Sequence, residues 1–285
     1  MGIVFGVVSA VCWGVGDFLI TLLARRIGTG RALIQIQVLS LLAWLALLAI
    51  HPLLPPASLS LWALLVATGV CHVLGLAFVY RAFEIGTLAI VSPISSAFAV
   101  VTGVLALTVG ERPPALILAG AVLLVGGIVL ATRSPISIEP SRNALVGVPE
   151  AIFSALAFGT MFWLFYFFVQ PRLGHALPLA ILKAMAAGGA LLAFAARRAP
   201  RPNGSPMFGS GTILLAAGAA GADTLAWLAY IWGMRSTYAT VVTALASLFS
   251  VVTVLLAWKV FRDRLAMHQW VGVAIILVGI LLVSL

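Results

Sequence analysis

The sequence has 285 residues, of which 63% are apolar and only 8% carry a charge. Soluble domains contain roughly 45–50% apolar and about 25% charged residues, so this chain could not cover its core with polar groups. Intrinsic disorder is excluded as well, because it requires low hydrophobicity and high charge. Cys12 and Cys71 both lie in apolar runs, which favours neither a disulfide framework nor a cysteine-based metal site. The composition predicts an integral membrane protein with the lipid bilayer around it.

Apolar segments run along the whole chain, separated by short breaks that carry turn residues and charge. A helix needs roughly 20 apolar residues to cross a bilayer. Strands of a membrane barrel would alternate apolar and polar residues, whereas these segments are apolar nearly all round. We therefore predict an all-α protein with ten transmembrane helices, over residues 3–23, 32–50, 61–83, 88–109, 114–132, 145–169, 178–197, 210–233, 238–260 and 266–285.

Lys and Arg are distributed unevenly among the predicted loops. The loops after the odd-numbered helices hold twelve of them, whereas the loops after the even-numbered helices hold three. Positively charged loops stay on the cytoplasmic side. We therefore expect a multi-pass protein of the inner (plasma) membrane with both termini outside the cytoplasm. The net charge of +9 is spread over these loops, so no nucleic-acid partner is expected.

The two halves of the chain repeat one another. With a shift of 152 residues, Glu111-Arg112 falls on Asp263-Arg264, and glycines 120 and 127 fall on glycines 272 and 279. Near the start of each half, Trp13-Gly14 resembles Phe158-Gly159. Five helices is an odd number, so successive halves enter the membrane from opposite sides. We predict two inverted five-helix repeats, over residues 1–139 and 140–285, with the polar linker 133–143 between them.

The duplicated acidic-Arg pair, each followed by a helix with glycines seven residues apart, resembles the EamA-type branch of the drug/metabolite transporter superfamily. The resemblance covers the whole chain and implies ten helices and the transport of small metabolites, commonly outward. Many such proteins carry a proline in both the fourth and ninth helices. Here Pro93 is present but Leu245 occupies the matching position, which removes the basis for a kink in the ninth helix.

Polar groups inside the predicted helices are the candidate site residues, because burying a charge in the membrane costs at least roughly 2.5–3.5 kcal/mol. Asp17 follows Trp13 by four residues, so the two share a helix face. Asp223 precedes Trp227 by four residues in the eighth helix. Each pair offers a carboxyl group and an aromatic plate. The alternative for both acids is a hydrogen bond that only packs one helix against another.

His72 and Lys183 are the other candidates for substrate binding. His72 lies in the middle of the third helix, where an imidazole could couple transport to protons or be satisfied by a neighbouring carbonyl. Lys183 could receive a substrate carboxylate. We expect instead that its long side chain reaches the outer interface. Trp163 is a further binding candidate, because its midspan position does not fit an aromatic belt at the interface.

Two other features point to local structure. Pro93 frees a backbone carbonyl that hydroxyl groups can satisfy, and Ser92, Ser95 and Ser96 surround it. This pattern favours either a bent gate beside the cavity or a simple kink. The two acidic-Arg pairs are expected to orient the last helix of each half.

The sequence thus predicts a secondary transporter and not an enzyme. Catalytic motifs, cofactor motifs and a metal-ligand cluster are not found, so neither a cofactor nor a metal is expected. We expect a monomer whose halves rock around a central cavity, and a small-molecule substrate. Aromatic or hydrophobic amino acids are the first choice, since both charge signs and stacking faces are available. The alternatives are efflux of lipophilic cations and, less favoured, an enzyme acting on lipid-linked substrates.

Overall fold

The computed structural model describes residues 2–50, 58–110, 115–132, 145–196, 208–236, 246, 248–261 and 266–283. Every element in these ranges is a helix. In chain order they are α1 Gly2–Ile27, α2 Thr29–Ile50, α3 Leu59–Ile85, α4 Leu88–Ser95, α5 Phe98–Ala106, η1 Leu107–Val109, α6 Ala115–Thr132, α7 Val148–Leu164, η2 Phe165–Val169, α8 Gln170–Leu173, α9 Ala176–Ala196, α10 Ser210–Ser236, α12 Phe249–Phe261 and α13 Met267–Val283.

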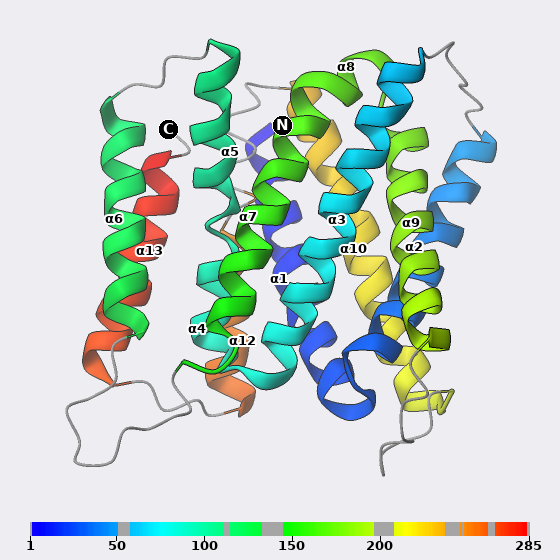
Figure 1. The fold of residues 1–285 in the computed structure, drawn as a ribbon. Coiled ribbons are helices and arrows are strands. Elements are labelled where there is room, and N and C mark those ends of the chain that lie inside the picture. Colours follow the sequence, from blue (N-terminus) through cyan, green and yellow to red (C-terminus); the bar gives the residue numbers. More distant parts are fainter. Residues whose placement is uncertain are drawn as a thin grey trace.

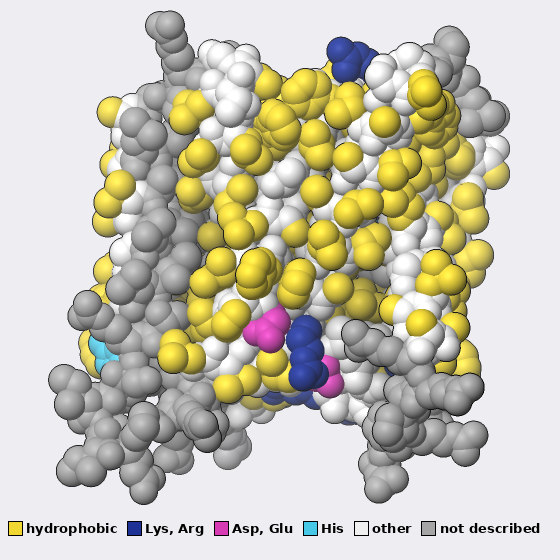
Figure 2. Space-filling view, viewed as in Figure 1, with side chains coloured by type: hydrophobic (Ala, Val, Ile, Leu, Met, Phe, Trp, Pro, Cys, Tyr) yellow, Lys and Arg dark blue, Asp and Glu magenta, His cyan; other side chains and the backbone are white. Residues whose placement is uncertain are grey.

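Seven spans within these ranges are long and apolar enough to cross a membrane, and two shorter apolar helices follow them. Figure 2 shows a face whose middle is covered by hydrophobic side chains, with Lys, Arg, Asp and Glu at its ends. The predicted spans match the helices closely, except that most of the predicted ninth span before residue 249 lies outside the described residues. The linker 133–143, both acidic-Arg pairs and Leu245 lie outside them too.

Corresponding helices of the two halves run in opposite directions. In Figure 1, α1 descends while α7 ascends, and α6 descends beside an ascending α13. The first residues of α1 and the last residues of α13 lie at the same end of the bundle, the top of the view. This antiparallel relation is what an inverted repeat requires.

The helices pack in groups that mix the two halves. Helix α1 of the first half contacts α10 and α12 of the second, and α7 of the second half contacts α3 and α5 of the first. In addition, α2 lies against α10 and α9 lies against α3, while α2 and α9 pack against each other across the two sets of helices. We call α1, α2, α10 and α12 the first group, and α3, α5, α7 and α9 the second group. The two groups are related by the repeat, whereas neither sequence half forms a packing unit by itself.

A close contact between backbones holds each group together. In the first group the Thr253 hydroxyl can donate to the Phe249 carbonyl of its own helix at 3.1 Å and to the Gly14 carbonyl of α1 at 3.3 Å. In the second group the Thr102 hydroxyl lies 3.0 Å from both the Phe98 carbonyl of its own helix and the Gly159 carbonyl of α7. A Cβ atom on Gly14 would lie 2.6 Å from the Phe249 carbonyl oxygen, which leaves no room for a side chain. A Cβ on Gly159 would lie 2.8 Å from the corresponding Phe98 oxygen. The glycines permit these approaches.

Two of the spans contain an irregular segment, one in each half of the chain. The proline of α4 cannot donate a backbone hydrogen bond, and the expected interruption is present: α4 ends at Ser95 and α5 begins at Phe98. The Ser96 hydroxyl donates to the Pro93 carbonyl at 2.7 Å. In the second half, residues Phe165–Val169 form a turn of π-helix just before Pro171. Such turns are frequent at functional sites.

The backbone contact at Gly14 generates a prediction about stability. We expect Gly14→Ala to destabilise the fold by about 1–3 kcal/mol, because the added methyl group overlaps Val252 and the Phe249 carbonyl. Gly159→Ala should have a similar effect. The measurement is the melting temperature of purified protein in detergent.

Gly188→Ala in α9 is the matched control, because a Cβ at Gly188 meets no atom within 4 Å. It should leave the melting temperature unchanged or raise it slightly, because alanine favours a helix over glycine by up to about 1 kcal/mol. Equal effects of the Gly14 and Gly188 substitutions would contradict the close contact.

Candidate functional site

A cavity of about 110 Å³ lies between the two groups. Trp13, Asp17, Ile20, Asp223, Trp227 and Phe249 line it from the first group, together with Gly16 of α1 and Gln37 of α2. His72, Leu76, Val79, Tyr80, Phe98, Phe158, Met161 and Phe162 line it from the second, and Ser95 of α4 completes the wall. The volume is enough for several water molecules.

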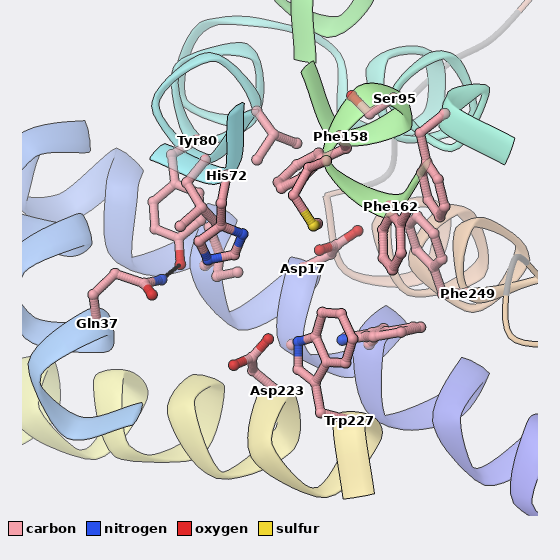
Figure 3. A pocket seen from close by; sticks show the side chains of 17 residues that line it. Asp17, Gln37, His72, Tyr80, Ser95, Phe158, Phe162, Asp223, Trp227 and Phe249 are labelled. Carbon is pink, nitrogen blue, oxygen red and sulfur yellow. Dashed lines mark hydrogen bonds between the residues drawn. The ribbon is translucent and has the colours of Figure 1, made fainter. Parts of the chain in front are cut away.

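Two acids face this space from neighbouring helices (Figure 3). Asp17 is presented by α1, and its Oδ2 atom is buried without a hydrogen-bond partner among the described residues. Asp223 is presented by α10, and its Oδ2 atom lies 2.7 Å from Lys183 Nζ. The two carboxyl groups therefore differ: Asp223 has a cationic partner, whereas Asp17 forms none of the ion pairs seen among the described residues.

Neutral polar groups gather on one side of the cavity. His72 is only 2% exposed, and neither of its ring nitrogens has a hydrogen-bond partner among the described residues. Close to it, Gln37 Nε2 donates to the Tyr80 hydroxyl at 3.3 Å. Figure 3 shows Gln37, Tyr80 and His72 on the same side of Asp17. Buried polar groups of this kind are normally satisfied, so this side is suited to a hydrogen-bonding ligand.

Aromatic rings form the opposite side. The Phe162 ring stacks on Phe98 with centroids 4.8 Å apart and on Trp227 with centroids 5.5 Å apart. Trp13 meets Trp227 edge to face at 5.4 Å and contacts Phe249 at 6.4 Å. Rings in such arrangements attract one another beyond their simple burial. The faces that remain open to the cavity offer stacking to a flat molecule and cation–π contact to a positive one.

Some of the predicted site residues line the cavity and others do not. Trp13, Asp17, His72, Asp223 and Trp227 line the same cavity, although they come from three helices in different parts of the sequence. Helical spacing together with the rarity of polar groups in apolar segments was enough to select them.

The expectation for Lys183 was wrong. Its side chain is 1% exposed and reaches inward from α9 to the carboxylate of Asp223, instead of reaching the outer interface. A membrane lysine can lower its cost of burial either by reaching water or by pairing, and here the acid on α10 is within reach. Lys183 does not line the cavity, so a direct contact with substrate is not supported.

Trp163 also does not line the cavity. Its ring packs edge to face on Phe168 at 5.1 Å, while the preceding residue Phe162 faces the cavity. One residue is a turn of 100° around a helix, so a shift of one position decides which side chain points inward. Gly14 and Gly159 accordingly align Trp13 with Phe158 and not with Trp163.

The cavity phenylalanines at 98, 158, 162 and 249 were not predicted. An aromatic residue in an apolar helix is unremarkable by itself, so composition gives no signal. A local repeat does: residues 98–106 read FAVVTGVLA and residues 249–257 read FSVVTVLLA. This match would have aligned Phe98 with Phe249 and Thr102 with Thr253.

The buried ion pair generates a second prediction. We expect Lys183→Met to destabilise the protein by roughly 3 kcal/mol, the lower end for a buried pair, because the Asp223 side chain is 21% exposed and can gain water. The double variant Lys183→Met/Asp223→Asn should recover part of this loss, since no unpaired charge remains. Unfolding in mixed detergent micelles measures both, and additive effects of the two substitutions would contradict the pair.

Comparisons with known proteins agree with this architecture. The model of the EamA-like transporter family matches residues 1–133 and 147–285, once in each half. No curated protein matches the sequence. A solved structure titled only "Crystal structure of protein" is 15% identical, with a TM-score of 0.62, and the match covers 99% of this chain and 95% of that one. That likeness concerns the fold alone. The chain is a multi-pass membrane protein that belongs to the EamA-like transporter family.

Proposed function

We propose that this protein is a secondary transporter that binds a small molecule in the central cavity and releases it on the other side of the membrane. The observation that carries the proposal is the cavity itself. It lies in the middle of an antiparallel bundle, between two groups of helices related by the repeat. Substrate sites at the midplane between inverted repeats are the arrangement that alternating access requires. The full complement is ten helices, with both termini outside the cytoplasm of the inner membrane.

The moving units that the packing favours are the two mixed groups. Each is held by its own threonine–glycine contact, and the cavity lies between them. A relative rotation of the groups would open the cavity toward one end of the bundle while closing it toward the other. Rocking of the sequence halves would separate α1 from α10 and α3 from α7, whereas rocking of the groups has to be accommodated mainly at the contact between α2 and α9. We therefore propose that the two groups, and not the two sequence halves, rock around the cavity.

The cavity chemistry supports a substrate with an aromatic or hydrophobic body and a positive group. The rings of Phe162 and Trp227 would hold the body, and the Oδ2 atom of Asp17, which has no hydrogen-bond partner among the described residues, would receive the positive group. Aromatic or hydrophobic amino acids, exported from the cell, remain the first candidate, with His72 available as a donor to the carboxylate.

Lipophilic cations are the second candidate, and one observation favours them. Lys183 is bound to Asp223 and does not line the cavity, so the amino-acid candidate loses the lysine that would have received its carboxylate. The described lining holds two acids and neither lysine nor arginine.

Transport by purified protein in liposomes tests the function. We expect wild-type protein to drive uptake of radiolabelled phenylalanine or tryptophan, or of the aromatic cation benzyltrimethylammonium. Asp17→Asn should reduce the rate at least about tenfold, because one partly desolvated charge pair is lost. Uptake of the cation alone would decide for the second candidate.

Glu150→Gln is the control, because Glu150 lies in the first turn of α7 and does not line the cavity. It should transport at the wild-type rate. An Asp17→Asn variant that transports as well as Glu150→Gln would refute the role of Asp17. A broad set of metabolites and cations that all fail to move would refute the transport function.

A further inference from the structure

We propose that Lys183 determines the charge of the molecule that the cavity accepts, without touching that molecule, by acting as a permanent internal counter-ion for Asp223. This inference rests on the proposed function, because it concerns the substrate of the same cavity. It predicts that the site takes a molecule with a single positive group and that the identity of residue 183 sets this limit.

Lys183 lies behind Asp223 as seen from the cavity. Lys183 belongs to α9, which packs against α2 and α3, and its side chain passes inward to α10. The side chain of Lys183 is 1% exposed, whereas that of Asp223 is 21% exposed and lines the cavity. The lysine therefore contacts the acid from outside the cavity lining.

The charged residues of the described lining are acidic. Among the lining residues, Asp17 and Asp223 are the acids, and lysine and arginine are absent from the described lining. With Asp223 engaged at 2.7 Å, Asp17 is the carboxyl group left for a ligand. One available carboxyl group beside aromatic rings fits one positive group on a flat or hydrophobic body. A second positive group would find no partner and would also approach Lys183.

The two halves of the chain differ at the position of Lys183. Gln37 and Lys183 each lie nine residues after a glycine with a positive φ angle, Gly28 and Gly174, so they occupy corresponding positions in the two halves. Gln37 donates a hydrogen bond to Tyr80 instead of forming an ion pair. Similar positions on the outer helices α2 and α9 thus send a long polar side chain inward, one neutral and one charged. Residue 183 is therefore a position where the charge beside the cavity can be changed without altering a lining residue.

The experiment compares two probes that differ in charge and share an aromatic body. Benzyltrimethylammonium carries one positive charge, and para-xylylene-bis(trimethylammonium) carries two. Affinity for each is obtained from the rise in melting temperature of purified protein with probe concentration, which follows mass action on the native state. The quantity of interest is the ratio of the two affinities, because a loss of stability alone would not change it.

We expect wild-type protein to bind the monocation more tightly than the dication. In Lys183→Met, Asp223 becomes available, and the ratio should move toward the dication at least about tenfold, as expected for one added charge pair. Lys183→Arg should keep the wild-type ratio. Lys183→Met/Asp223→Asn should restore it as well, and this variant remains informative if Lys183→Met is too unstable to purify, since an altered ratio in it would overturn the proposal.

The outcomes separate this proposal from the transport function. An unchanged ratio in Lys183→Met, with monocation binding still dependent on Asp17, overturns the role of Lys183 and leaves the function standing. Wild-type protein that binds neither probe but transports amino acids also overturns the role of Lys183 and leaves the transport function standing. The expected pattern of ratios in a protein that moves nothing across liposomes supports the role of Lys183 and refutes transport.

Discussion

Two glycines let helix backbones from different halves of the chain come into direct contact beside a threonine hydroxyl, and the walls of the cavity are built on these contacts. Thr253 binds the Gly14 carbonyl and Thr102 binds the Gly159 carbonyl, in each case where a Cβ atom would have no room. Inside a membrane the apolar surface of a helix gains little by leaving lipid, so close packing at small residues and hydrogen bonds between helices must supply the association. The contacts therefore fix which helices belong together: α1 with α12, and α7 with α5.

This exchange of partners explains why the cavity has two chemically different sides. Each group contributes helices from both halves, so the repeat imposes the same backbone on the two walls and leaves their side chains independent. Gly14 and Gly159 align Asp17 with Phe162: one half presents an acid where the other presents a ring. Figure 3 shows the result, with the polar side chains and the stacked rings on opposite sides of Asp17. A fold with two related halves thus encloses a cavity whose two sides differ chemically.

The parts of this architecture that the sequence predicts are those for which lipid is the decisive solvent. Span positions follow from apolar length, and Asp17, His72 and Asp223 are conspicuous because hydrocarbon penalises them. The phenylalanines are equally at home in lipid, so only the threonine-containing repeat at residues 98–106 and 249–257 identifies two of them. Lys183 shows a different limit. Its side chain is long enough to reach either the interface or the interior, and the choice depends on the distance to Asp223, which exists only in the folded bundle.

The cost of that ion pair bears on its purpose. Taking two charges out of water costs several kcal/mol per ion, and replacing a buried pair with neutral groups is often neutral or stabilising. The first half demonstrates such a replacement in the same fold, because Gln37 and Tyr80 join α2 to α3 with a neutral hydrogen bond. Packing of an outer helix on the inner bundle therefore does not require a charge at this position. What the charge changes is the cavity, where it engages one of two acids and leaves the other for a ligand. The lysine is explained by the chemistry of the site and not by the stability of the fold.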